Sequence, residues 1–222
     1  MSGGNTLYAC DRWKQINLHT HLTEAAYRGC VLTGGSAGAI CWFTGGHSDS
    51  MDPSSYRKDN IPSASESNYD EIFKKWSYIR VPCLNIFPGI VCPHYDKIQS
   101  NGILRAIDFD NMMKRHHNER GICIDHWASI VLFGDGTFEI FCPENTPGSV
   151  DIENNFDKNR NGKPGCWIKD VVDQCTVETK LIGTHGTRGK IDDLFRATID
   201  NSDIIEDDKL TLARTLNPIP PK

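Results

Sequence analysis

Helix-like and strand-like patterns of apolar residues alternate along the first two thirds of the chain. Two helices are predicted from about Thr6 to Gln15, with Asn5 or Thr6 as the cap, and from about Leu18 to Tyr27. The apolar run 30–33 predicts a short buried strand, and residues 37–43 predict a helix because no proline interrupts them. Between these two lies a turn that is rich in glycine.

The later segments continue this alternation. Residues 44–66 are rich in Gly, Ser, Asp and Pro without periodicity, which predicts a long loop. Two strands are predicted within 78–92, with a turn at Pro88-Gly89, and a helix follows over 103–117. Three more strands are predicted at 121–124, 129–133 and 137–142, and a hairpin turn at 134–136 joins the last two. A short helix is predicted over 191–199. This order predicts an α/β fold whose mainly parallel sheet ends in an antiparallel hairpin.

The character of the chain changes after Pro143. Residues 151–164 are polar and rich in Asn and Asp, which is typical of a linker or loop. We therefore expect an α/β domain over 1–143 and a C-terminal extension, partly loop, over 144–222.

Composition narrows the class of function. The 222 residues carry a net charge of −5 without a block of Lys and Arg, so we expect neither a nucleic-acid partner nor a membrane partner. No stretch approaches the roughly 20 apolar residues of a membrane span, and the N-terminus lacks the features of a signal peptide. A cytoplasmic protein is expected. Its nine cysteines contain no C-x-x-C pair, which favours free thiols, and we expect no metal and no other cofactor.

The segment Gly34-Gly35-Ser36-Ala37-Gly38 has the pattern of a nucleophile elbow. Glycines permit the sharp turn between a strand and a helix, and the serine hydroxyl then projects away from the sheet. At the start of the following helix, free amides favour a developing oxyanion. Ser36 is therefore the candidate nucleophile.

A serine nucleophile needs a base, and His94 is the best candidate among the eight histidines. It follows a predicted buried strand, and ligands of open parallel sheets bind outside the carboxyl ends of strands. Asp125 follows the strand 121–124 in the same way and is expected to orient the imidazole. Its neighbour His126 is an alternative orienter, although a neutral imidazole stabilises a cation less than a carboxylate does.

Other polar residues offer alternatives. His47 lies close to Ser36 in sequence and is expected to contact substrate, together with Asp49 from the same segment. An α/β-hydrolase arrangement would instead use Ser36 with Asp135 or another carboxylate and His185, but a hairpin turn explains Asp135 more simply.

Several segments together resemble the peptidase E (aspartyl dipeptidase) family, the S51 serine peptidases. The matching segments are Gly3-Gly4-Asn5-Thr6, Gly34-Gly35-Ser36-Ala37-Gly38-Ala39, Ile40-Cys41-Trp42-Phe43, Gly46-His47-Ser48-Asp49-Ser50, Cys92-Pro93-His94-Tyr95-Asp96 and Gly121-Ile122-Cys123-Ile124-Asp125. The resemblance covers about residues 3–142. It implies a flavodoxin-like fold, related to class I glutamine amidotransferases, with helices on both faces of the sheet.

The resemblance also implies a function. Ser36 would be the nucleophile and His94 the base, and the amides of Gly4 and Ala37 would form the oxyanion hole. The implied activity is the hydrolysis of short peptides, with a preference for an N-terminal Asp whose carboxylate Arg105 would bind. The expected partner is a small peptide, and a homodimer is left open.

Two departures from the family keep a non-enzymatic alternative open. The chain has His126 where the family usually has an acidic residue, and it begins at the family's glycine turn, so an N-terminally truncated domain is expected. An inactive homologue that acts as a binding subunit is the alternative.

Overall fold

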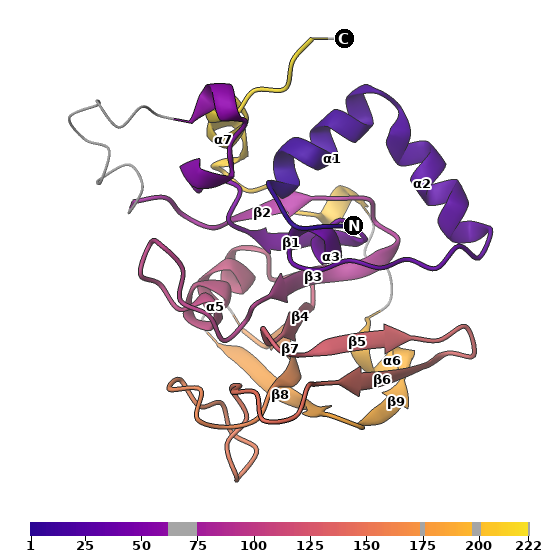
Figure 1. Ribbon diagram of the computed structural model, residues 1–222, viewed down its shortest axis with the longest axis vertical. Helices are drawn as coiled ribbons and strands as arrows, with labels where there is room; N and C mark the ends of the chain where they lie inside the picture. Colours follow the sequence, from indigo (N-terminus) through magenta and orange to yellow (C-terminus); the bar gives the residue numbers. More distant parts are fainter. Residues whose placement is uncertain (62–74, 174–175, 197–200, 222) are drawn as a thin grey trace. The chain divides into compact units, whose positions relative to one another are not determined.

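The computed structural model describes residues 1–61, 75–173, 176–196 and 201–221 (Figure 1). The chain forms two compact units: unit 1 comprises Met1–Phe87, Ser100–Gly102 and Glu206–Lys222, and unit 2 comprises Pro88–Gln99 and Ile103–Ile205. The domain boundary expected near residue 143 stays a prediction. Among the described residues, no helix is long and apolar enough to cross a bilayer.

Unit 1 combines helices with one short antiparallel ladder. Its elements are α1 (Thr6–Gln15), α2 (Leu18–Tyr27), α3 (Ala37–Ile40), β1 (Phe43–Ser48), the 3-10 turns Pro53–Ser55 and Lys58–Asn60, β2 (Ile79–Pro82) and α7 (Leu210–Leu216). The bounds of α1 and α2 agree with the sequence prediction. The Asn5 side chain caps α1 by accepting a hydrogen bond from the Tyr8 amide, which satisfies a donor that the helix leaves unpaired.

Three sequence predictions for unit 1 were wrong at least in part. The run 30–33 forms no strand, and Val31 is 88% exposed, because an apolar pattern does not supply a pairing partner. The helix predicted over 37–43 ends at Ile40, and the segment predicted as a loop from Thr44 begins instead within β1. The part of that segment over 62–66 lies outside the described residues.

Close packing explains why β1 contains two glycines. A Cβ on Gly46 would lie 2.2 Å from Ile40 Cγ2, and one on Gly45 would lie 2.8 Å from Arg80 Cζ. Glycine therefore lets α3 and the buried Arg80 side chain approach the strand. β1 pairs with β2 in antiparallel register, with Gly45 opposite Pro82.

Unit 2 contains a mixed sheet and a smaller antiparallel sheet. Its elements are β3 (Phe87–Pro93, whose first residue belongs to unit 1), α5 (Arg105–Arg115), β4 (Gly121–Ile124), β5 (Ser129–Leu132), β6 (Thr137–Phe141), β7 (Gly165–Val171), β8 (Val177–Thr184), β9 (Arg188–Lys190), α6 (Ile191–Leu194) and the 3-10 turn Asn201–Asp203. β3 pairs with β4 in parallel, whereas β4–β7 and β7–β8 are antiparallel. β5, β6 and β9 form the smaller sheet.

The mixed α/β class and the antiparallel hairpin β5–β6 confirm the corresponding predictions. Among the described residues of unit 2, parallel pairing is limited to β3 with β4, because β7 and β8, which follow residue 143, add antiparallel neighbours. The turn predicted at Pro88-Gly89 lies inside β3. Gly89 has φ 102°, and a Cβ there would lie 2.7 Å from the Arg120 carbonyl oxygen.

The helix predicted over 103–117 is confirmed as α5 with slightly shorter ends. Its buried positions follow the helical period: Arg105, Ala106, Phe109, Met112 and Met113. Gly121 at the start of β4 makes room for this face, since a Cβ there would lie 2.7 Å from Phe109 Cε1.

Candidate active site

Ser36 has the strained backbone that a nucleophile elbow requires. Its φ of 54° and ψ of −125° are rare for a residue with a side chain. The turn is tight on both sides: a Cβ on Gly34 would lie 2.1 Å from the Gly38 carbonyl oxygen, and one on Gly38 would lie 2.4 Å from the Met1 carbonyl oxygen. The Ser36 hydroxyl does not cap α3. Local geometry thus fits the pattern Gly34-Gly35-Ser36-Ala37-Gly38.

The two candidate oxyanion donors lie in the same unit as Ser36. Neither the Ala37 amide nor the Gly4 amide donates a backbone hydrogen bond within the described part of the chain. Gly3, which precedes Gly4, lies beside the nucleophile, since a Cβ built on it would be 3.7 Å from Ser36 Oγ. Because α3 has only four residues, individual amides rather than a helix dipole would stabilise an oxyanion here.

A cavity of about 330 Å³ adjoins these amides. Gly4 and Ala37 both line it, and further walls come from Tyr8 in α1 and from Tyr56 and Arg57. Unit 1 therefore places a hollow of the size of a small ligand next to the candidate oxyanion donors.

His94 directly follows β3, as the sequence predicted. Its backbone has φ 51°, and its side chain is half-buried. The following residue, Tyr95, donates its amide to the Ile124 carbonyl at the end of β4, 3.0 Å away. His94 and the residues after β4 consequently meet at the carboxyl edge of two neighbouring parallel strands.

The side chain that faces His94 is His126. The two Nδ1 atoms are 2.8 Å apart, which requires one ring to donate and the other to accept. Desolvation by burial lowers the pKa of His126, the positive charge of Lys97 lowers it further, and Asp96 acts in the opposite direction. A neutral His126 can accept a hydrogen bond from His94 Nδ1–H. The His126 backbone amide is itself held by Asp96 Oδ1 at 2.7 Å.

Asp125 occupies a different environment from the one the sequence suggested. Its buried carboxylate accepts hydrogen bonds from the Ser149 amide, the Ser149 hydroxyl and the Gly165 amide at 2.8–3.0 Å. Burial raises the pKa of Asp125 to about 7, with repulsion from Asp96 adding to the effect. These contacts tie the end of β4 to the segments at Ser149 and Gly165 and so position His126.

The candidate substrate-binding residues of unit 1 differ in exposure. His47 is completely buried in β1 and stacks on Tyr78 with ring centroids 4.2 Å apart. This burial does not fit the expectation that His47 contacts substrate. Asp49 is half-buried, and its carbonyl accepts a hydrogen bond from the Asp52 amide, so its substrate role stays a prediction.

Arg105 lies in the interior at the start of α5, with 1% of its surface exposed. Its charge acts on the Cys92 thiol, whose pKa burial nevertheless raises to about 12. A side chain enclosed in this way does not fit the role of reading a substrate carboxylate. The reason is the helical register, which directs position 105 to the same face as Phe109 and Met112.

Asp135 and His185, the residues of the α/β-hydrolase alternative, have local roles in unit 2. Asp135 accepts hydrogen bonds from the Thr137 amide and hydroxyl in the β5–β6 turn. His185 Nδ1 accepts one from the Cys142 amide. A structural turn explains Asp135, as the sequence suggested, and this arrangement gives no support to a catalytic pair.

The described cysteines are free thiols, as predicted; Cys175 lies outside the described residues. Within the described ranges, no group of three or more His, Cys, Asp or Glu side chains could hold a metal ion.

Sequence reasoning missed Asp96, Ser149 and Arg57. Asp96 follows His94 by two residues in a matching segment, so its position beyond β3 could have indicated it. Ser149 is 24 residues from Asp125 in a segment predicted to be a separate extension, and no local pattern reveals that contact.

The fold and these geometries define an α/β protein with a nucleophile elbow in one unit and a histidine pair at a strand edge in the other. Residues 1–140 match the family described as peptidase family S51, and the chain belongs to that family. The family is one of peptidases, and membership implies a class I glutamine amidotransferase-like fold.

Two curated proteins share sequence with the chain. A protein of Trypanosoma brucei brucei named G2/mitotic-specific cyclin-1 is 32% identical over 179 residues, which cover 78% of this chain and 49% of that protein. The uncharacterized peptidase YgaJ of Bacillus subtilis strain 168 is 34% identical over 96 residues, which cover 43% of this chain and 31% of that protein. The chain thus spans about half, or less, of the length of these relatives.

Proposed function

We propose that this protein is a serine peptidase that hydrolyses short peptides, with Ser36 as the nucleophile and His94 as the general base. The observation that carries the proposal is the backbone of Ser36, whose positive φ occurs in a turn too tight for a side chain at Gly34 or Gly38. Strain of this kind costs about 1–3 kcal/mol and persists where it serves a site. Family membership and the matching segments around His94 support the same assignment.

The proposed chemistry is acyl transfer. Ser36 Oγ attacks the peptide carbonyl carbon while His94 Nε2 takes the hydroxyl proton. The carbonyl oxygen becomes an oxyanion that the amides of Ala37 and Gly4 stabilise. When the C–N bond breaks, His94 returns the proton to the leaving amine, and water then hydrolyses the acyl-enzyme by the same steps.

His126 takes the place of the carboxylate in this proposal. Because its pKa is lowered, it stays neutral and accepts the proton of His94 Nδ1–H. This hydrogen bond fixes the tautomer of His94 in which Nε2 carries the lone pair that accepts the proton of Ser36. Asp125 serves as a positioning residue through its bonds to Ser149 and Gly165.

The finer assignments are carried by the family resemblance. A dipeptide with an N-terminal Asp is the substrate that it implies, and a cytoplasmic location and a homodimer stay predictions.

A non-catalytic binding role is the alternative, and the name of the trypanosomal relative denotes a regulatory protein. Such a role would have no use for the strained conformation of Ser36. The hydrolase is therefore the better-supported function.

Labelling of the full chain with a fluorophosphonate probe tests the proposal. Ser36→Ala should abolish both labelling and hydrolysis of Asp-Leu, because loss of a triad nucleophile lowers turnover by up to about 10⁶-fold. Ser54→Ala, at an exposed serine of the same unit, is the matched control and should retain both. Labelling that persists in Ser36→Ala, or that never occurs in the unmodified chain, would contradict the hydrolase assignment.

A further inference from the structure

The cavity beside the candidate oxyanion donors has an arginine in its wall. Gly4, Ala37 and Arg57 all line this space of about 330 Å³ in unit 1. We propose that Arg57 determines specificity by binding a carboxylate of the peptide substrate while the scissile carbonyl faces the amides of Gly4 and Ala37. This inference rests on the proposed peptidase function and replaces Arg105, which is enclosed in unit 2.

The charge of the cavity wall favours an anionic ligand. None of the described residues that line the cavity is Asp or Glu. A peptide carboxylate that enters would therefore meet the Arg57 guanidinium, which can bind both carboxylate oxygens at once, with Asp59 from outside the lining as its competitor.

Asp59, the ion-pair partner of Arg57, is one that a ligand can displace. Arg57 Nη2 lies 2.5 Å from Asp59 Oδ2, and the two side chains are 37% and 74% exposed. Ion pairs this open to solvent contribute little free energy, and Asp59 can be rehydrated when it leaves. A substrate carboxylate that is less exposed to water than Asp59 would be attracted to Arg57 with less solvent screening.

The backbone of Arg57 is held by the C-terminal segment. The Arg57 amide donates to Asn217 Oδ1 at 3.0 Å, and Asn60 Nδ2 donates to the same oxygen at 3.0 Å. Asn217 is buried, so this anchor is shielded from water. Asn217 is thus a positioning residue for Arg57.

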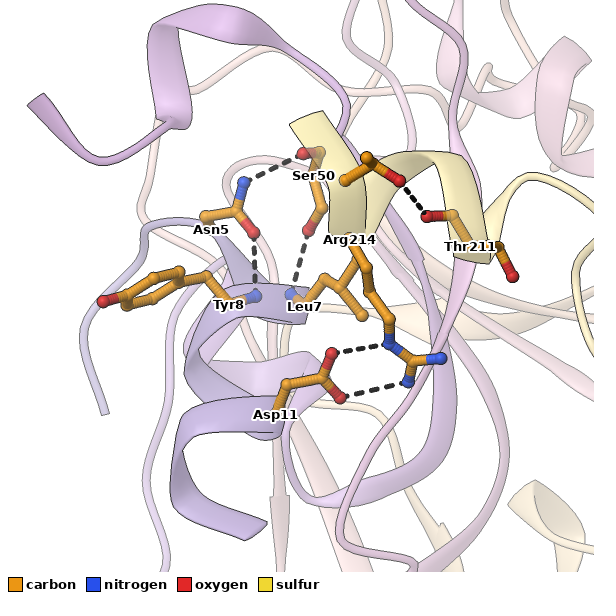
Figure 2. A network of polar contacts seen from close by, with 8 residues as sticks. Asn5, Leu7, Tyr8, Asp11, Ser50, Thr211 and Arg214 are labelled. Carbon is orange, nitrogen blue, oxygen red and sulfur yellow. Dashed lines mark hydrogen bonds and ion pairs between the residues drawn. The ribbon is translucent and has the colours of Figure 1, made fainter. Parts of the chain in front are cut away.

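Another part of the cavity wall, at Asn5 and Ser55, is fixed as well. Asn5 Nδ2 donates to the Ser50 carbonyl and to Ser55 Oγ, and Ser50 Oγ accepts from the Leu7 amide, as Figure 2 shows in part. These bonds tie the start of α1 to the segment that leads to Arg57. The cavity is therefore pre-organised, which lowers the entropy lost when a small ligand binds.

A dipeptide offers two carboxylates with the same chemistry, the side chain of an N-terminal Asp and the C-terminal group. Binding of Asp-Leu, Ala-Leu and Asp-Leu amide to the full chain carrying Ser36→Ala, measured by calorimetry, separates them. Arg57→Met should weaken Asp-Leu binding about tenfold. Arg57→Lys should weaken it less, because lysine keeps the positive charge but lacks the planar guanidinium that binds two oxygens at once.

The pattern across peptides identifies the carboxylate. If Arg57 binds the Asp side chain, Arg57→Met should weaken the binding of Asp-Leu and Asp-Leu amide but not of Ala-Leu. If Arg57 binds the C-terminal carboxylate, Arg57→Met should weaken the binding of Asp-Leu and Ala-Leu but not of Asp-Leu amide. Asp59→Asn should strengthen binding, since it removes the competing carboxylate. Arg28→Met, at a 78% exposed arginine of the same unit, is the matched control and should change nothing.

Failure of the inference can be told from failure of the proposed function. If Ser36 is labelled at the same rate in Arg57→Met as in the unmodified chain, yet no peptide affinity changes, the peptidase assignment stands and the role of Arg57 is refuted. Equal weakening of all three peptides, or no binding of any of them, also refutes it. Absence of labelling in the unmodified chain refutes the proposed function itself.

Discussion

His94 Nδ1 and His126 Nδ1 face each other at 2.8 Å at the carboxyl edge of β3 and β4. An imidazole in this position can fix the tautomer of His94, but it stabilises the imidazolium formed during catalysis less than a carboxylate would. The pair therefore orients the base without providing a strong counter-charge.

The first prediction tests this pair. His126→Ala should lower kcat/KM for peptide hydrolysis by about 10²-fold, because His94 loses the partner that fixes its orientation. His126→Glu should raise kcat/KM above that of the unmodified chain and move the acidic limb of its pH profile upward, since a carboxylate raises the pKa of His94, which must be deprotonated to act as the base. His117→Ala, at an exposed histidine after α5, serves as the control. A larger loss for Asp125→Asn than for His126→Ala would assign the orienting role to Asp125 instead.

The second prediction concerns the glycines of the elbow. Gly34→Ala places a Cβ 2.1 Å from the Gly38 carbonyl oxygen, so the backbone must shift and Ser36 must move with it. We expect a loss of about 1–3 kcal/mol in the free energy of unfolding and at least tenfold slower probe labelling. Gly35→Ala is the matched control, because a Cβ there meets no atom within 4 Å. Similar labelling rates for the two variants would show that the elbow is not rigid.

The third prediction is a pH dependence of stability that Asp125 causes. Its pKa in the folded protein is about 7, well above the value of about 3.8 expected when unfolded. Between these values the folded state holds a proton that the unfolded state has released, so stability decreases as pH rises through this window. The slope from this group has a ceiling of about 1.4 kcal/mol per pH unit.

Thermal unfolding between about pH 4 and pH 8 measures this slope. Asp125→Asn should lower the overall stability, because it disturbs the bonds to Ser149 and Gly165, and should also flatten the pH dependence. Asp96, whose negative charge contributes to the raised pKa of Asp125, is the second residue to substitute in this experiment. An unchanged slope in Asp125→Asn would mean that another group titrates there.

The sequence predicted the features that depend on local patterns. The Asn5 cap, the bounds of α1 and α2, the β5–β6 hairpin and the positions of His94 and Asp125 after strands each require only a few neighbouring residues. The tight turn at Ser36 is another feature that depends on a local pattern, since the glycines around it are close in the sequence.

The features that were missed depend on distant contacts. β1 was taken for a loop because its glycines have a purpose only against Ile40 and Arg80. The hydrogen bonds from Ser149 and Gly165 to Asp125 could not be predicted, because no local pattern links these residues. Arg57 was not selected because its anchor, Asn217, lies 160 residues away.

The final prediction concerns the attachment of the C-terminal segment to α1. Arg214 in α7 donates through Nε and Nη2 to the two carboxylate oxygens of Asp11 at 2.7 Å and 3.1 Å, as Figure 2 shows. Arg12 and Gln15 also donate to the Pro220 carbonyl. These contacts hold the segment that carries Asn217 against α1 in unit 1.

A double-mutant cycle with Asp11→Asn and Arg214→Met measures the strength of this ion pair. The pair is bidentate, but Arg214 is 45% exposed, so solvent screens the attraction. We therefore expect a coupling free energy of about 0.5–1 kcal/mol that decreases as salt is added. The Glu24–Arg28 pair on α2, with its 3.9 Å separation and both side chains exposed, is the control and should couple more weakly. Equal coupling in the two cycles, or coupling that is independent of salt, would show that the ion pair does not attach the segment and that burial around Asn217 does.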